Sequence, residues 1–345
     1  MKTPQILVTI ASFIVIVAGM RAAEVILVPF LLAAFIAIIS ASPMFWLKKR
    51  GVPTWLSLLI VVLGILLAGF LVSAMVGSSV RDFSKDLPVY QAKLKNQTAA
   101  VIAWFEKTGF EVSGPALAET FDPGAAMSLV ASILNSLGNV LANAFLILMT
   151  VIFILLEASS FPSKLKAVLG GEDSSLVRFE KFLDTVKQYM AIKTWISLAT
   201  GICITLWLAI LGVDYALLWG LLAFVLNYVP NIGSIIAAIP AVFLSVIQFG
   251  VGRALIVVAG YAAVNIITGN VLEPRFMGRG LGLSTLVVFL SLLFWGWILG
   301  PVGMLLSVPL TITAKIALDS REDTRWIALL LGPEDPMDAG EQKSS

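Results

Sequence analysis

The sequence contains no histidine and a single cysteine, and charged residues make up only 13% of its 345 positions. Without histidine, the HExxH zinc motif and the Ser-His-Asp and Cys-His catalytic sets are excluded. One cysteine, Cys203, cannot form a disulfide or a CxxC site within one chain, and its place in an apolar run predicts a buried small side chain. A Walker-type phosphate-binding loop is also missing. We therefore expect no enzymatic activity, no cofactor and no metal.

The low charge content indicates a membrane protein. Soluble domains carry about 25% charged residues, whereas 59% of this chain is apolar. Apolar runs of about 20 residues recur, each long enough to cross a hydrocarbon layer of about 30 Å as a helix. The net charge of +2, without a basic tract carrying interleaved aromatics, predicts no nucleic-acid partner. The predicted fold class is an all-α polytopic membrane protein surrounded by lipid, with about eight transmembrane helices, re-entrant or broken helical hairpins and amphipathic interfacial helices.

Eight apolar segments have the length and composition of membrane spans. They cover approximately 5–20, 25–42, 54–80, 138–157, 192–211, 253–271, 283–299 and 301–318. The first run resembles a signal peptide, but a second follows after a short polar break, Arg21 to Glu24, so we expect a retained helical hairpin. The segment 215–249 stands apart, because its two halves are short for a full crossing and fit a re-entrant hairpin.

Basic residues predict the orientation of the chain. Lys48, Lys49 and Arg50 follow the second span and place that loop in the cytoplasm under the positive-inside rule. The connection 81–137 has no positive bias and is expected outside, while the Lys/Arg-rich stretch 158–191 returns the chain to the cytoplasm. Both termini are therefore expected in the cytoplasm.

On this interpretation the chain divides into six segments. They are the N-terminal transmembrane helices 1–80, an extracytoplasmic amphipathic helical insertion 81–137, a transmembrane helix 138–157, a cytoplasmic amphipathic helix 158–191, a C-terminal transport core with broken helices 192–318, and a cytoplasmic tail 319–345. The two polar segments carry apolar stripes at helical spacing, formed by Leu87, Tyr90, Leu94, Val101 and Phe105 and by Phe179, Phe182, Leu183, Val186 and Met190. We expect these stripes to pack at the membrane surface or against a neighbouring subunit.

The stretch LNYVPNIGSIIAAIP interrupts the apolar pattern of the segment 215–249. Pro230 removes a backbone donor, Gly233 loosens the chain, and a helix is expected to restart near Ser234. Lipid cannot satisfy free backbone groups, so such a break is tolerated only against protein or beside a water-filled cavity. The restarted helix directs free N–H groups at whatever occupies the break. The alternative is a polar turn between two helices.

A second interruption, GNVLEPRFMGRGLGLS, places Glu273 and Arg275 on either side of a proline, and Ser284 is expected to cap the next helix. The alternative is an ordinary cytoplasmic turn. A third, WGWILGPVGMLLSVP, predicts a hairpin tip with close helix approach. The residues predicted to line a substrate or ion pathway are Asn227, Pro230, Asn231, Gly233, Ser234, Asn265, Asn270, Glu273 and Arg275, and those predicted to break or hinge the helices are Pro274, Gly278, Gly280, Gly300 and Pro301.

These segments make the chain resemble a known family. The stretches WGLLAFVLNYVPNIGSIIAAIP and GNVLEPRFMGRGLGLSTLVVFLSLLFWGWILGPVGMLLSVPL are similar to the signature segments of the autoinducer-2 exporter family of bacterial inner-membrane proteins, and FDPGAAMSL near Phe121 adds support. The resemblance implies a helical exporter assembled as a homo-oligomer, a pentamer. It also implies a small-molecule signal as substrate, a neutral or borate-complexed furanone-type sugar derivative, although other members are associated with sodium/proton antiport.

Three functions remain open at this point. Export of a polyhydroxylated signal fits the polar, sparsely charged breaks, with Arg275 pairing with Glu273 when the site is empty. Sodium/proton antiport requires a carboxylate that binds both ions in turn, for which Glu273 and then Asp214 are the candidates, but the neighbouring Arg275 favours a permanently ionised Glu273. A membrane scaffold explains the amphipathic helices but not the breaks. Without a nucleotide loop, an ion or substrate gradient would supply the energy for transport.

Overall fold

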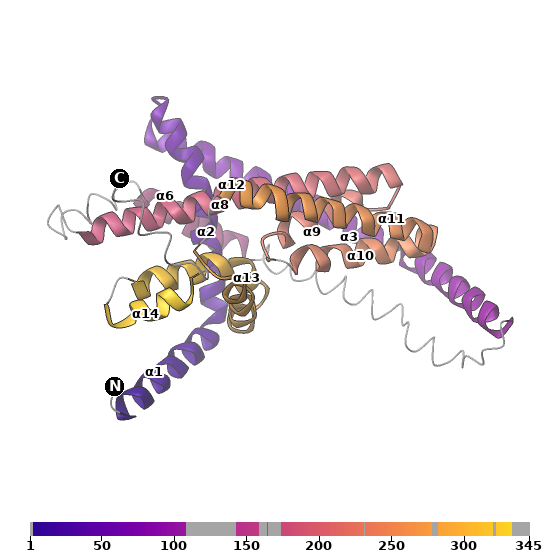
Figure 1. Cartoon of the computed structure of the whole chain (residues 1–345). Helices are drawn as coiled ribbons and strands as arrows, with labels where there is room; N and C mark the ends of the chain where they lie inside the picture. The colour runs from indigo at the N-terminus through magenta and orange to yellow at the C-terminus, as the bar shows by residue number, and fades with distance from the viewer. Residues whose placement is uncertain are drawn as a thin grey trace.

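The computed structural model describes residues 3–107, 143–158, 164, 174–230, 232–277, 282–319 and 322–332. These residues form helices joined by short turns, without a β-strand among them (Figure 1). The helices are α1 (Thr3–Ala22), α2 (Glu24–Lys49), α3 (Thr54–Lys107), α6 (Ala144–Ala158), α8 (Ser174–Leu211), α9 (Ala216–Leu226), α10 (Gly233–Phe249), α11 (Val251–Asn265), the π-helix η1 (Ile266–Leu272), α12 (Glu273–Met277), α13 (Thr285–Asp319) and α14 (Glu322–Leu330). Of the predicted insertion 81–137, residues 81–107 belong to α3, and 108–137, including Phe121, lie outside the described residues.

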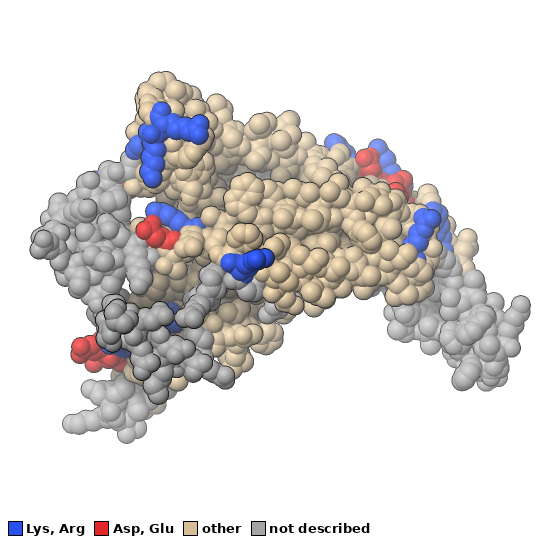
Figure 2. Space-filling view, turned by 45° about the horizontal axis from the view of Figure 1, so that its top comes forward, with Lys and Arg blue, Asp and Glu red and all other residues tan. Residues whose placement is uncertain are grey.

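Five helical segments in the described part are long and apolar enough to cross a membrane, and they are Glu24–Lys49, Thr54–Phe83, Leu183–Leu211, Val251–Leu272 and Thr285–Asp319. Four shorter apolar helices accompany them: Leu7–Ala22, Ala144–Ala158, Ala216–Leu226 and Gly233–Phe249. Figure 2 shows few charged side chains on the face it presents, with a broad uncharged area between them. Large apolar side chains are exposed along most of the helices, which fits a surface that meets lipid. The predicted all-α polytopic class is confirmed.

The N-terminal helices pack through small residues on α2. Ala33, Ala37 and Ala41 recur at i, i+4 and are almost completely buried, which puts them on one face of the helix. Val151 and Leu155 of α6 fill the space that these small side chains leave. The result is a close contact between α2 and α6, to which α3 adds Val61 from its first turns.

The second core joins α8, α9, α10 and α11. Gly201 of α8 and Gly220 of α9 allow the two helices to approach, since a Cβ on Gly201 would lie 2.8 Å from the Gly220 carbonyl oxygen. Trp219 and Leu208 are buried between these helices. Figure 1 shows α9, α10 and α11 gathered with α3 at one end of the molecule.

Helices α9 and α10 form a hairpin over the predicted segment 215–249. The turn between them is tight, because a Cβ on Gly233 would overlap the carbonyl oxygen of Leu226. The open ends of the hairpin also meet, since the backbone N–H of Asp214 donates to the side-chain oxygen of Gln248 at 3.2 Å. The structure therefore has two short helices folded on each other as a hairpin.

Helix α13 is two helices that meet at Gly300, whose φ of 63° and ψ of −152° are not helical. The two arms fold back on each other. The indole N–H of Trp295 donates to Thr311 Oγ1 at 3.0 Å, although 16 positions separate these residues along the chain, and a Cβ on Gly303 would overlap the Trp295 carbonyl oxygen. The chain turns at the predicted position, and glycine is suited to it because φ is positive there.

Two predicted boundaries fall inside continuous helices. Helix α3 runs through position 80 and α8 through position 191, so each predicted span continues into the polar segment beside it without a break in the helix. The apolar stripes predicted to meet the membrane surface pack within the chain where their side chains are described: Tyr90 is buried in the α8–α11 core, and Val186 and Met190 are buried against α13. A helix face that contacts lipid and a helix face that packs against protein have the same periodicity of apolar residues, so the spacing in the sequence does not distinguish the two.

The prediction for Cys203 is wrong. Its side chain is exposed on α8, next to the exposed Ile202. An apolar run predicts burial only in a soluble protein, whereas a helix that faces lipid keeps apolar residues on its outer surface as well.

Candidate transport site

A polar cavity of about 340 Å³ lies where the broken helices meet α8. The hairpin turn, the end of α11, the π-helix η1, α12 and the start of α13 all contribute to its wall. The lining residues are Lys193, Asn227, Val229, Pro230, Ser234, Asn265, Ile266, Gly269, Asn270, Glu273, Leu283, Thr285 and Val288. Segments separated by up to about a hundred positions in sequence therefore converge on one space whose surface is mostly polar.

An ion pair between Lys193 and Glu273 dominates this wall. The ammonium of Lys193 donates to both carboxylate oxygens of Glu273, at 2.7 and 2.9 Å. The Lys193 side chain is 3% exposed and that of Glu273 is 26% exposed, so the lysine is enclosed by protein and the glutamate borders the cavity. Because each charge satisfies the other, the pair is stable in an environment where either charge alone would be costly.

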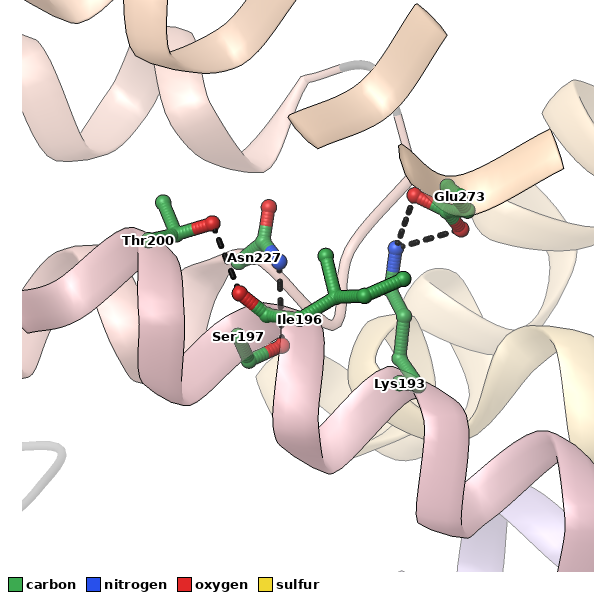
Figure 3. Close-up of polar contacts among 6 residues, drawn as sticks. All are labelled: Lys193, Ile196, Ser197, Thr200, Asn227 and Glu273. Carbon is green, nitrogen blue, oxygen red and sulfur yellow. Dashed lines mark hydrogen bonds and ion pairs between the residues drawn. The ribbon is translucent and has the colours of Figure 1, made fainter. Parts of the chain in front are cut away.

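Asn227 lies at the end of α9, where it terminates the first arm of the hairpin. Its side-chain amide donates to Ser197 Oγ at 3.0 Å, and one turn further along α8 the hydroxyl of Thr200 donates to the Ile196 carbonyl oxygen at 2.9 Å (Figure 3). The phenolic hydroxyl of the next residue, Tyr228, donates to Thr194 Oγ1 at 2.8 Å. The hydrogen bonds of Asn227 and Tyr228 fix the hairpin turn against α8 beside the ion pair.

A π-helix brings the polar residues of α11 to the cavity. Over Ile266–Leu272 the helix widens from α to π geometry, and this widened segment carries Gly269 and Asn270. Asn265 immediately precedes it and Glu273 immediately follows it. Single π-turns inside α-helices frequently mark functional sites, because the extra residue per turn redirects the side chains that follow. The predicted polar face of this helix is therefore directed at the cavity by a local change in helix geometry.

The structure brings together most, but not all, of the residues predicted for the pathway. Asn227, Pro230, Ser234, Asn265, Asn270 and Glu273 line the cavity. Gly233 forms the tight hairpin turn beside it. Asn231, Gly278 and Gly280 lie outside the described residues. The predicted cap is present, because Ser284 Oγ accepts from the backbone N–H of Val287 at 3.3 Å.

Arg275 differs from the prediction. It is exposed on α12 and is absent from the cavity wall, and the described partner of Glu273 is Lys193. Residues two apart on a helix point in different directions, so Glu273 and Arg275, on either side of Pro274, do not face each other. Gly300 and Pro301, which were predicted to break or hinge the helices, are not among the lining residues of the cavity, and a Cβ on Gly300 would lie 3.2 Å from Glu24 Oε1 at the start of α2.

Lys193 was not among the residues predicted for the pathway. It lies at the start of the predicted span 192–211, where a lysine is interpreted as a signal for the orientation of the chain in the membrane. A signal was nevertheless present. Lys193, Ser197 and Thr200 follow one another at i, i+4 and i+7, which is a polar stripe on an otherwise apolar helix. A stripe of this kind indicates a face that meets other polar groups rather than lipid.

The fold and the site define a class of protein. Several apolar spans that enclose a polar cavity between interrupted helices, with a buried ion pair in its wall, are typical of a membrane transporter. The model of the AI-2E family transporter family matches residues 10–322, and the chain belongs to this family.

Three relatives are similar over almost their whole length. The chain is 43% identical over 327 residues to the AI-2 transport protein TqsA of Escherichia coli K12, covering 95% of both sequences. It is 41% identical over 332 residues to a putative transport protein of Haemophilus influenzae, covering 94% of this chain and 95% of the relative. It is 38% identical over 343 residues to the putative transport protein YhhT of E. coli K12, covering 97% and 98%.

Proposed function

We propose that this transporter exports autoinducer-2, a small polyhydroxylated furanone-type signal, as the neutral molecule or its borate complex. The observation that carries the proposal is the polar cavity around the Lys193–Glu273 pair. Its volume lies in the range of about 300–1,000 Å³ that small-molecule sites occupy. The relative named AI-2 transport protein supports the choice of substrate.

The side chains around the cavity suit a solute rich in hydroxyl groups. The amides of Asn265 and Asn270 each offer donors and an acceptor, so they can bond to hydroxyls in either sense. The Lys193–Glu273 pair adds no net charge, which matches a neutral solute. An anionic borate complex can compete with Glu273 for the ammonium of Lys193, since the ammonium can donate charge-assisted hydrogen bonds to either anion.

Movement of the solute requires the cavity to open on one side and then on the other. We infer that α8 and the hairpin α9–α10 shift as one unit against α13, because α8 packs closely on α9 through Gly201 and Gly220, whereas the start of α13 supplies a separate part of the cavity wall. Rigid-body movement of broken-helix units against a scaffold is the usual route of alternating access.

The direct experiment measures autoinducer-2 flux into or out of proteoliposomes that contain the purified protein, with and without a sodium or proton gradient. We expect protein-dependent flux that falls by about tenfold in the Asn265→Ala, Asn270→Ala double variant, which removes two sets of hydrogen bonds of about 0.5–1.5 kcal/mol each. Flux that is unchanged in this variant rules out the cavity as the pathway.

Sodium/proton antiport through Glu273 is the competing function. The ion pair weighs against it, because sodium would have to displace the Lys193 ammonium from both carboxylate oxygens. The same proteoliposomes decide the matter: proton movement on addition of sodium that is lost in Glu273→Gln, without any flux of the signal, makes antiport the function. Retained proton movement in Glu273→Gln excludes it.

We further propose that the protein works as a homo-oligomer, a pentamer, in the bacterial inner membrane with both termini in the cytoplasm, and that it transports without catalysing a reaction. The family membership and the basic cluster after α2 support these assignments. The mass of the detergent-solubilised assembly, measured by native mass spectrometry, tests the pentamer, and any other integral number of chains contradicts it.

A further inference from the structure

Helix α3 belongs to two different hydrophobic cores. Its first turns pack on α2 and α6 through Val61 and Ile65. Its later turns, from Val72 to Tyr90, pack in the core that α8, α9, α10 and α11 share. One continuous helix therefore runs from the first core to the second, and the change from one to the other falls within the segment 66–71.

The two cores lie in parts of the molecule that move against each other in the transport proposed above. Ile298 of α13 is buried with Val17 of α1, and Leu31 of α2 packs against them. Helix α13 therefore belongs with α1, α2 and α6, and we call these four helices the scaffold. Helices α8, α9 and α10 are the moving unit. Because α3 is packed on the scaffold at its start and on the moving unit further along, a shift of the moving unit must be taken up within α3.

The segment 66–71 has little support from the rest of the chain. Its large apolar side chains are all exposed, and they are Leu66, Leu67, Phe70 and Leu71. A Cβ on Gly69 would meet no atom of the described residues within 4 Å, whereas Gly201 is needed for the close approach of α8 to α9. Glycine weakens the interior of a helix relative to alanine. Packing within the described chain therefore gives no reason for a glycine at position 69.

A serine one turn further along weakens the same part of α3. The hydroxyl of Ser73 donates to the carbonyl oxygen of Gly69 at 2.7 Å. This oxygen is also the acceptor of the backbone hydrogen bond of that helical turn, and a serine that bonds back in this way often bends a helix. Kinks in helices are found at pairs of glycine and serine. Two features that favour bending therefore coincide where α3 passes from one core to the other.

We propose that α3 is the hinge between the scaffold and the moving unit, and that it bends at Gly69 and Ser73 during each transport cycle. A few backbone positions that absorb the change in φ and ψ are typical of such hinges, and they lie away from the substrate. The first turns of α3 stay on α2 and α6, and the later turns follow the hairpin α9–α10. The hinge rests on the proposed movement, but it does not depend on which solute the cavity binds.

The test measures the distance between the scaffold and the moving unit in proteoliposomes by double electron–electron resonance. Spin labels are attached after Phe153→Cys in α6 and Ile210→Cys in α8, both exposed positions, with Cys203→Ala because Cys203 is exposed as well. Labelled chains are co-expressed with an excess of unlabelled chain, so that distances within one chain dominate. We expect two distances when α3 is unaltered. The double variant Gly69→Ala, Ser73→Ala should show one distance, and its signal flux should fall by about fivefold, equivalent to about 1 kcal/mol.

The double variant Gly77→Ala, Ser78→Ala is the matched control in the same helix. A Cβ on Gly77 also meets no described atom within 4 Å, and the hydroxyl of Ser78 donates to the Met75 carbonyl oxygen at 3.0 Å. This pair lies beside the buried Val76, where α3 already packs on the moving unit. Both double variants should raise the thermal midpoint by about 1–3 °C, because alanine favours the helix in each. The control should keep both distances and its full flux.

Equal distance distributions and equal flux in the two double variants would overturn the hinge. A single distance in the protein with an unaltered α3 would overturn it as well, because the two parts would then not move against each other. Two distances without any flux of the signal, reduced to one in the Gly69→Ala, Ser73→Ala variant alone, would support the hinge and refute the proposed solute. The hinge and the proposed function can therefore fail separately.

Discussion

At the scale of single residues, Lys193 is the most constrained side chain of the site. It lies within an apolar span, where an ammonium without a partner is unfavourable by several kcal/mol. Glu273 supplies the opposite charge from a segment 80 positions later in the chain. The pair therefore ties α12 to α8, and the geometry of the cavity depends on both residues together.

Replacing one residue of this ion pair should destabilise the protein more than replacing both. Lys193→Met or Glu273→Gln alone leaves one charge without its partner, which lowers the free energy of unfolding by about 3–5 kcal/mol. The double variant should lose clearly less than the sum of the single losses. Thermal unfolding in detergent measures all three variants.

Lys187→Met is the control for the lysine, because the Asp184 partner of Lys187 is exposed to solvent. Its effect should stay within about 0.5 kcal/mol. Additive losses at Lys193 and Glu273 would contradict the ion pair.

Substitutions at two asparagines of the cavity should have different effects, one on stability and the other on transport. Asn227 is 8% exposed and hydrogen-bonded to Ser197, so Asn227→Ala should lower stability by about 1–3 kcal/mol. Asn270 is exposed on the cavity wall, so Asn270→Ala should lower signal flux with little change in thermal midpoint. Equal thermal midpoints for the two variants would show that the Asn227 contact does not hold the hairpin.

At the scale of elements, the breaks depend on glycines that have no room for a side chain. Gly233→Ala places a methyl group against the Leu226 carbonyl oxygen, which should open the hairpin turn, cost about 1–3 kcal/mol and reduce flux. Gly252→Ala in the first turn of α11 meets no atom within 4 Å and should be neutral or slightly stabilising. Thermal midpoints and flux of both variants measure the contrast, and similar behaviour of the two variants would contradict it.

The open end of this hairpin is held by a separate polar cluster. The hydroxyl of Tyr90 on α3 donates to Asp214 Oδ2 at 2.7 Å, and the Gln248 amide also donates to Asp214. Burial, with the neighbouring Asp214, raises the pKa of Tyr90 to about 12, so the hydroxyl remains a donor at physiological pH. The contact joins the outer part of α3 to the base of α9–α10.

This contact predicts a pH dependence at the alkaline end. Because the folded-state pKa of Tyr90 is raised, its stabilising contribution is complete below the unfolded value of about 10 and is lost as the pH rises through about 12. Tyr90→Phe should lower the free energy of unfolding at pH 7 by about 1.5–3 kcal/mol and weaken the alkaline loss. Thermal midpoints from pH 7 to pH 11 measure both effects, and an unchanged alkaline slope would contradict the assignment.

The sequence predicted the elements better than their contacts. Pro230 and Gly233, and Gly300 with Pro301, locate two hairpin turns, because these residues limit helix continuation locally. The partner of Glu273 was not predicted correctly, since pairing depends on how distant helices pack and the nearest cation in sequence, Arg275, points elsewhere. The π-helix η1 was also not predicted, because its sequence has no feature that distinguishes it from an α-helix.

At the scale of the whole molecule, the cavity joins the turn of one hairpin to the base of another. Asn227 and Pro230 come from the turn of α9–α10, whereas Leu283 and Thr285 lie where α13 begins. The cavity therefore lies at the tip of one hairpin and at the base of the other. Broken helices that meet at a shared site are a recurring feature of transporters that work by alternating access.

The orientation of the molecule is open to a direct test. A fluorescent protein fused after Ser345 should fold and fluoresce in the cytoplasm, and alkaline phosphatase fused after Lys107 should be active outside it. This expectation follows from Lys48, Lys49 and Arg50 at the end of α2. Fluorescence and phosphatase activity at the opposite sites would invert the topology.

The length of α3 has a practical consequence for imaging. Its 54 residues extend for about 80 Å as a continuous helix, whereas a bilayer core is about 30 Å thick. A large part of this helix must therefore project beyond a detergent micelle or nanodisc, as its free end does from the rest of the molecule in Figure 1. In single-particle electron micrographs, this rod marks one face of each particle, so particles of a small, smooth membrane protein can be aligned and their sidedness assigned without an added antibody fragment.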